Sequence, residues 1–162
     1  MLRVAAGVGT QRAGKDPVDE SSIAQSHGLP DRRHRLLVAE DNRSFRELLV
    51  AVLMADGHEV VAVTNGGDLL DTLAVSADPQ LGSGKFDLVI SDVRMPGSTG
   101  LHVFSQMAGA PRIPPFILIT AFGDQNLHTV ASGLGVLAVI DKPFDVDDLR
   151  KFVSEFLATG GA

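Results

Sequence analysis

Residues 86–97 read FDLVISDVRMPG, and this stretch decides how the chain folds. The apolar run Phe86–Ile90 delivers Asp92 into a turn that Pro and Gly close. Such a run is typical of a buried strand that ends at a loop. Asp92 is therefore expected at the carboxyl end of a strand, where open parallel α/β sheets place their ligand crevices. A charge at that point indicates chemistry rather than packing.

Strand-like and helix-like runs alternate after residue 35. The expected strands are 36–39, 59–63, 86–91, 115–120 and 136–140. The expected helices are 43–55, 67–75, 101–108, 123–132 and 146–157, with a loop over 76–85. Strict alternation implies right-handed βαβ connections. The sequence therefore predicts an α/β fold with a doubly wound, five-stranded parallel sheet and helices on both of its faces.

Local patterns place the first helix and the core aromatics. Asn42 is expected to cap the first helix and Gly57 to end it. Its apolar stripe is expected to comprise Phe45, Leu48, Leu49, Val52 and Leu53. The aromatic residues expected in the core are Phe104, Phe116, Phe144, Phe152 and Phe156. The fourth helix has the weakest pattern, because Gly, Asn, Thr and Ser surround its few apolar residues.

Residues 1–35 differ in composition from the rest of the chain. They are rich in Gly, Ser, Asp and Arg and show no apolar period, so we expect a mobile or disordered arm. Residues 36–158 then form one folded domain, followed by a tail at 159–162. The arm holds six Lys and Arg against four Asp and Glu, and the remainder holds eight against sixteen. An acidic domain argues against direct nucleic-acid binding.

Several classes of site are disfavoured by the sequence. There is no cysteine, so a disulfide framework and a thiolate metal site are excluded. No apolar stretch reaches the roughly 18 residues of a membrane span, and we expect a cytoplasmic protein without membrane contact. Residues 9–16, GTQRAGKD, depart from the phosphate-loop pattern at Asp16, so no nucleotide site is expected there. The five histidines lack zinc-ligand spacing and are interpreted as surface or loop residues.

Carboxylates follow two of the expected strands. Glu40 and Asp41 follow the first strand as Asp92 follows the third, and these strands are neighbours in a doubly wound sheet. Three carboxylates in one crevice repel one another unless a cation or protons intervene. Mg²⁺ prefers oxygen ligands and keeps several waters, so it suits this cluster, with Mn²⁺ able to substitute.

Two further strand ends offer groups for a phosphoryl ligand. The fourth strand ends in Thr120 and Ala121, which supply a hydroxyl and a backbone N–H. Lys142 follows the fifth strand and supplies an ammonium. Phosphoryl transfer depends mostly on positioning and charge stabilisation, so this set would allow Asp92 to accept a phosphoryl group.

Residues 36–158 resemble the receiver domain of two-component response regulators, of the stand-alone chemotaxis type. The motifs that carry the resemblance are VAED (38–41), DLVISDVRMPGSTG (87–100), ILITA (117–121) and DKPF (141–144). The resemblance implies a flavodoxin-like strand order 2-1-3-4-5. It also implies a signalling switch rather than a metabolic enzyme, with Asp92 phosphorylated by a histidine kinase or a histidine phosphotransfer protein.

The resemblance also implies roles for the neighbours of Asp92. Asp41, Asp92 and the backbone carbonyl of Arg94 would ligate Mg²⁺, and Glu40 would do so directly or through water. Thr120 and Lys142 would bind the phosphoryl oxygens and carry the switch outward.

The chain departs from the family pattern at the switch. Val139 stands three residues before Lys142, where the family usually has Tyr or Phe, so the aromatic part of the switch is missing. Arg94 and Phe122 occupy the positions that tune phosphoryl lifetime in this family. The bulk of Phe122 predicts slow autodephosphorylation, and a half-life of only seconds would contradict this.

Three functions are compatible with these patterns. The first is a stand-alone receiver, which is expected because the chain ends at Ala162. Such a receiver would act on an unknown downstream protein, as a monomer or as a phosphorylation-dependent dimer. The second is a pseudo-receiver, an interaction module that is not regulated by phosphorylation, as Val139 would favour. The third is a hydrolase of the haloacid-dehalogenase type, which is disfavoured because Arg94 stands where that family has a second Asp.

Overall fold

The computed structural model describes residues 2–4, 33–78, 80, 84–110, 112–121 and 125–160. Its strands are β1 (Leu2–Val4), β2 (Arg35–Ala39), β3 (Glu59–Val63), β4 (Leu88–Asp92), β5 (Phe116–Thr120) and β6 (Ala138–Asp141). Its helices are α1 (Arg43–Ala55), α2 (Gly66–Ala77), α3 (Gly100–Met107), α4 (Gln125–Leu134) and α5 (Val146–Ala158). All ten expected elements are present, with bounds within two residues of those predicted. The expected loop at 76–85 is wrong at its start, because α2 continues to Ala77.

The strands form one sheet in the order β1-β6-β5-β4-β2-β3. The pairs β3–β2, β2–β4, β4–β5 and β5–β6 are parallel. Numbered among themselves, the five parallel strands have the predicted order 2-1-3-4-5. The chain moves outward from β2 in one direction to β3 and in the other to β4, so the crevice at this reversal lies between β2 and β4.

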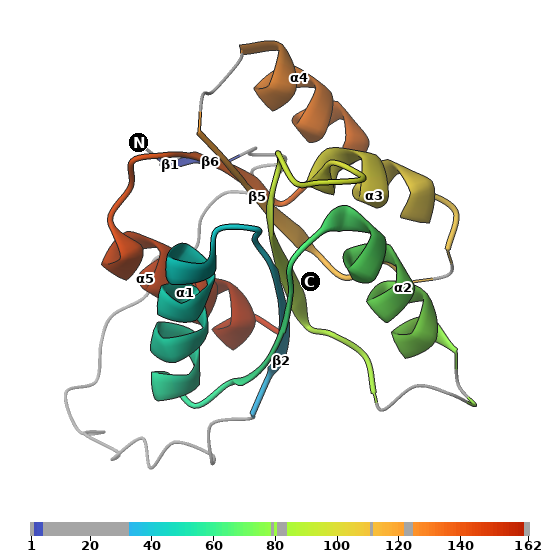
Figure 1. The fold of residues 1–162 in the computed structure, drawn as a ribbon. Coiled ribbons are helices and arrows are strands. Elements are labelled where there is room, and N and C mark those ends of the chain that lie inside the picture. Colours follow the sequence, from blue (N-terminus) through green and yellow to red (C-terminus); the bar gives the residue numbers. More distant parts are fainter. Residues whose placement is uncertain are drawn as a thin grey trace, which may run out of the picture.

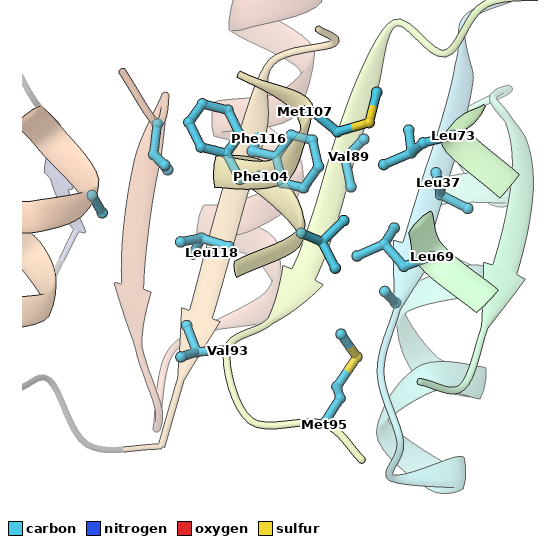
Figure 2. Close-up of a cluster of buried hydrophobic side chains, with 14 of the residues drawn as sticks. Leu37, Leu69, Leu73, Val89, Val93, Met95, Phe104, Met107, Phe116 and Leu118 are labelled. Atoms are coloured by element: carbon cyan, nitrogen blue, oxygen red, sulfur yellow. The ribbon is translucent and has the colours of Figure 1, made fainter. Parts of the chain in front are cut away.

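Helices cover both faces of the sheet (Figure 1). On one face, α1 and α5 enclose Leu36, Ile90 and Ile117 of the strands. On the other face, α2, α3 and α4 enclose a second cluster, which Figure 2 shows between the helices and the strands. Successive strand residues point to opposite faces of the sheet. Because helices cover both faces, β4 and β5 are buried along their whole lengths. Burial on both faces explains their continuous apolar sequences.

The expected side-chain placements are confirmed with one exception. Asn42 caps α1 by accepting a hydrogen bond from the Phe45 N–H at 3.0 Å. Leu49 and Leu53 are buried, whereas Leu48 is 44% exposed and its prediction as part of the buried stripe is wrong. A helix period places Leu48 beside the stripe, but the sheet contacts only the narrower row that contains Leu49 and Leu53. Two of the five expected core aromatics, Phe104 and Phe116, are buried in the cluster beneath α2, α3 and α4. The other three are partly buried and pack against the cluster beneath α1 and α5: Phe144, Phe152 and Phe156.

One strand was not predicted. β1 lies within the segment expected to be a disordered arm, and it pairs antiparallel with β6, with Leu2 opposite Ile140 and Val4 opposite Ala138. The arm prediction is therefore wrong at residues 2–4, while residues 5–32 lie outside the described residues. Three residues are too few to show a period in the sequence. The pairing satisfies backbone groups that the outer edge of β6 would otherwise leave unpaired.

Candidate functional site

The chemistry-bearing residues meet at the carboxyl ends of four parallel strands. Asp92 is the last residue of β4, and Thr120 is the last residue of β5. Glu40 follows β2, and Lys142 follows β6. Glu40, Asp92 and Thr120 are buried, with 1%, 8% and 1% of their surfaces exposed. Parallel pairing brings these residues together from positions up to about a hundred residues apart, as the sequence predicted.

The three predicted carboxylates form one cluster. Glu40, Asp41 and Asp92 each offer an oxygen, and these atoms lie within 4.8 Å of one another. Two of these side chains are buried and that of Asp41 is exposed, so the cluster opens to solvent on one side. A donor set made only of carboxylate oxygens suits a hard divalent cation such as Mg²⁺. The residues present therefore fit the metal that the sequence predicted.

Lys142 lies between two of the carboxylates. Its Nζ donates to Glu40 Oε2 at 3.0 Å and to Asp92 Oδ2 at 3.2 Å. The same ammonium lies 4.5 Å from the centre of the Phe45 ring, a cation–π distance. Phe45 was predicted only as part of the α1 stripe, because no local spacing reveals a contact with a residue nearly one hundred positions later. The aromatic ring limits where the flexible Lys142 side chain can place its charge.

Burial and neighbouring charges shift the pKa values of Glu40 and Lys142. Burial raises the pKa of Glu40, and the charge of Asp92 adds to the effect, although the N–H of Asn42 and the Lys142 ammonium oppose it. Burial alone would lower the pKa of Lys142, but the hydrogen bond to Glu40 and the charges of Asp92 and Glu40 outweigh it, and the pKa is raised. Lys142 therefore stays charged beside Asp92.

Backbone amides hold both buried carboxylates in place. The N–H of Asn42 donates to Glu40 Oε1, and the N–H of Arg94 donates to Asp92 Oδ1, both at 3.0 Å. The sequence suggested the carbonyl of Arg94 as a metal ligand but did not reveal its amide as a donor. With Lys142 on Oδ2, each oxygen of Asp92 has a separate partner, which fixes the plane of the carboxylate.

Two glycines bring the surrounding backbone close to the site. A Cβ at Gly100, the first residue of α3, would meet Ser91 Oγ and lie 2.6 Å from the carbonyl oxygen of Asp92. A Cβ at Gly66, the first residue of α2, would meet the carbonyl oxygen of Ser98 and lie 2.8 Å from its Cβ. Neither position has room for another residue, so both helices begin in direct contact with β4 or the loop that follows it. Gly100 closes the quoted 87–100 motif, but the motif alone does not explain why it is needed.

The predicted phosphoryl-binding residues lie at the same edge. Thr120 is paired in register with Asp141, and its carbonyl accepts a hydrogen bond from the Lys142 N–H at 2.7 Å. Ala121 follows Thr120 directly after β5 and is exposed. Val139 is buried in the cluster beneath α4. Phe122 lies outside the described residues, so the slow autodephosphorylation stays a prediction, and residues 9–16 lie outside them too.

One histidine has a defined partner near the site. His128 Nε2 on α4 lies 3.1 Å from Asp141 Oδ1 and 3.2 Å from Asp141 Oδ2. The sequence interpretation as a surface or loop histidine missed this contact, because its partner is thirteen residues away in another element.

None of the described helices has the length and apolarity needed to cross a membrane.

Fold and site together define a doubly wound α/β domain with an acidic cluster and a lysine at its switch point. The model of the response regulator receiver domain family matches residues 36–154, and the chain belongs to this family. The match places it in two-component signalling.

Curated relatives agree with this assignment. The chain is 36% identical over 115 residues to the transcriptional regulatory protein PdtaR of Mycobacterium tuberculosis, a match that covers 71% of this chain and 52% of that protein. The chain thus spans about half the length of this relative. It is 28% identical over 123 residues to sporulation initiation phosphotransferase F of Bacillus subtilis, covering 76% of this chain and 93% of that protein.

Solved structures show the same fold. The response regulator TrrA of Thermotoga maritima, solved in complex with Mg(2+)-BeF, is 30% identical with a TM-score of 0.62, covering 75% of this chain and 97% of that chain. The receiver domain of the putative LuxO repressor of Vibrio parahaemolyticus is 24% identical with a TM-score of 0.69 and supports the fold alone. This match covers 78% of this chain and 92% of that one.

Proposed function

We propose that the chain is a phosphoacceptor receiver that takes a phosphoryl group on Asp92. The observation that carries the proposal is the state of this carboxylate. It is buried, it accepts from Lys142 and from the N–H of Arg94, and it lies in an acidic cluster at the switch point. A solvated carboxylate would need none of these neighbours, and a structural ion pair with Lys142 would not need the two further carboxylates of the cluster. The phosphoryl donor is a phosphohistidine on a histidine kinase or on a histidine phosphotransfer protein.

The transfer exchanges one bond to phosphorus for another. An oxygen of Asp92 bonds to phosphorus as the P–N bond of the phosphohistidine breaks, and the donor imidazole keeps the electron pair of that bond. Lys142, the Thr120 hydroxyl and the Ala121 N–H then neutralise the phosphoryl oxygens. The partly buried Lys142 contributes most, because its charge already lies 3.2 Å from the acceptor carboxylate.

The same site would hold Mg²⁺, with Mn²⁺ as a substitute. Glu40, Asp41 and Asp92 supply carboxylate oxygens from one cluster. The backbone carbonyl of Arg94 belongs to the loop that follows Asp92. The similar protein TrrA was solved with Mg(2+)-BeF. When bound, the ion supplies positive charge for carboxylate and phosphoryl oxygens. It also relieves the repulsion among the three carboxylates.

The output is a protein contact. The domain over residues 36–158 acts on a downstream protein in the cytoplasm, as a monomer or as a phosphorylation-dependent dimer, without direct nucleic-acid or membrane binding. It is a switch that catalyses only its own phosphoryl transfer and dephosphorylation. The acidic domain and its likeness to sporulation initiation phosphotransferase F over 93% of that protein support this reading.

Incubation with acetyl phosphate and Mg²⁺, followed by intact-mass measurement, tests the proposal. We expect a single phosphoryl adduct in the wild type and none in Asp92→Asn. Asp71→Asn is a matched control that removes an exposed carboxylate of α2, and it is expected to keep the adduct. Omitting Mg²⁺ should reduce loading.

An absent adduct in the wild type, or an adduct that survives in Asp92→Asn, would contradict the proposal. The first result would favour the pseudo-receiver, the alternative that Val139 supports. Turnover of a phosphate monoester would instead indicate a hydrolase. Both alternatives are thus decided by the same preparation.

A further inference from the structure

The contact between His128 and Asp141 joins α4 to the end of the sheet that carries the site. His128 Nε2 lies within hydrogen-bond distance of both oxygens of Asp141, at 3.1 and 3.2 Å. A carboxylate can only accept, so Nε2 carries the proton and donates. The His128 and Asp141 side chains are 23% and 38% exposed, so water only partly screens the contact.

A second, apolar contact fixes the same two elements. Asp141 and Val139 are two residues apart on β6 and therefore point to the same face of the sheet. His128 and Ala131 are three residues apart on α4 and therefore lie on the same side of the helix. Val139 and Ala131 are both buried in one cluster, against which Leu127 of α4 also packs. The helix is thus held to the sheet by one polar contact and by apolar packing.

The polar point is connected to Asp92 through short contacts. Asp141 is paired in register with Thr120, and the next residue, Lys142, donates its backbone N–H to the Thr120 carbonyl at 2.7 Å. The Lys142 ammonium in turn contacts Asp92 Oδ2. Asp141 therefore cannot move independently of the two residues that would bind phosphoryl oxygens.

We propose that His128 and Asp141 are positioning residues that couple the place of α4 to the phosphoryl-binding end of the sheet. The proposal rests on the proposed function, because the coupling matters only if Asp92 is phosphorylated. When Thr120 and Lys142 are drawn toward a phosphoryl group, Asp141 moves with them, and His128 transmits the displacement to α4. Val139, two residues earlier on β6, has no polar atom in its side chain and cannot make a comparable link.

The first test uses the unphosphorylated chain of residues 1–162 and hydrogen–deuterium exchange of the α4 amides. We expect His128→Ala and Asp141→Ala each to speed exchange in α4 by roughly two- to tenfold, as loss of one hydrogen bond predicts. The double variant should exceed the larger single effect only slightly, because both changes remove one contact. Unchanged exchange in α4, or single effects that multiply in the double variant, would overturn the proposal.

A conservative variant separates the contact from general packing. The amide nitrogen of glutamine lies close to the position of His Nε2, so His128→Gln should restore the exchange rates of the wild type. A lack of rescue would show that the imidazole acts by packing alone and would overturn the proposal. Exchange in α5 serves as the internal control and should stay constant in all variants.

The second test asks whether the contact transmits the phosphorylated state. Intact mass should show that Asp92 loads from acetyl phosphate in both the wild type and His128→Ala. Loading should change α4 exchange in the wild type and leave it unchanged in His128→Ala, whereas an equal response in both would overturn the proposal. If Asp92 fails to load in the wild type, the proposed function fails, and the exchange cycle in unphosphorylated protein still decides the positioning role.

Discussion

The two helices that follow the last two parallel strands, α4 and α5, are anchored very differently. On α5, Leu149, Val153 and Leu157 are buried against the sheet. On α4, Ala131 is the one buried residue among those described, and Val130 and Leu134 are 50% and 44% exposed. Since burial of large apolar side chains supplies most packing energy, α5 belongs to the core and α4 rests on its surface.

Their polar contacts differ in the same direction. Arg150 of α5 binds both oxygens of Asp56 at the end of α1, with Nε 2.9 Å from Oδ2. That contact joins α5 to α1, beside which it lies in Figure 1. His128 of α4 instead binds Asp141 at the end of the strand that leads to the site. One helix is fixed to the scaffold, and the other is linked to the site, so a signal at the site should reach α4 and leave α5 in place.

The largest expected difference in the free energy of unfolding comes from replacing one leucine on each helix by alanine. Leu149→Ala opens a cavity at a fully buried position and should lower the free energy of unfolding by about 2–5 kcal/mol. Leu134→Ala, at a half-exposed position of α4, should change it by about 0.5 kcal/mol or less. Urea unfolding followed by circular dichroism measures both. Equal losses would show that the sheet anchors α4 and α5 equally.

A glycine near the end of α4 gives a smaller effect. A Cβ at Gly133 would meet nothing within 4 Å, so Gly133→Ala should raise the free energy of unfolding by about 0.5–1 kcal/mol through helix propensity. Gly135 is the matched control, because its φ of +89° penalises any side chain, and Gly135→Ala should lower stability by about 1 kcal/mol. The same unfolding measurement applies. Destabilisation by both substitutions would show that α4 is not limited by its own helix propensity.

The smallest expected effect is the pH dependence of the contact between α5 and α1. The hydrogen bond from Arg150 lowers the pKa of Asp56 below its usual 3.8, although burial opposes it. A carboxylate with a lowered pKa contributes stability that is present above pH 3.8 and lost as the pH falls through the folded-state pKa.

The midpoint of urea unfolding should therefore be lower in Asp56→Asn than in the wild type at pH 7. The gap should close as the pH falls below 3.8. A gap that is independent of pH would mean that Asp56 acts by packing instead.

Patterns local in the sequence were sufficient for the parallel fold. The apolar runs of β4 and β5 and the alternation with helices predicted a doubly wound parallel sheet, while its strand order came from the resemblance to receiver domains. Parallel pairing then placed Asp92, Glu40 and Lys142 at one edge. The site residues were placed correctly because the carboxyl ends of parallel strands lie at the same edge of the sheet.

Contacts between distant side chains could not be predicted in this way. The Lys142 ammonium over Phe45 and the pairing of His128 with Asp141 depend on how helices pack on the sheet, which no local spacing encodes. β1 was missed because three residues show no period. The exposure of Leu48 was missed because a helix period does not reveal how wide a stripe the sheet covers.

Whether phosphorylation at Asp92 displaces α4 and leaves α5 in place can be measured by a pair of ¹H–¹⁵N NMR spectra, recorded with Mg²⁺ alone and with Mg²⁺ plus beryllofluoride as a phosphoryl mimic. We expect large shifts for the amides of Asp92, Thr120 and Lys142 and for those of α4. The amides over Leu149–Leu157 of α5 should keep their positions in the spectrum. Shifts confined to the site, or shifts of equal size in α4 and α5, would contradict a selective coupling of the site to α4.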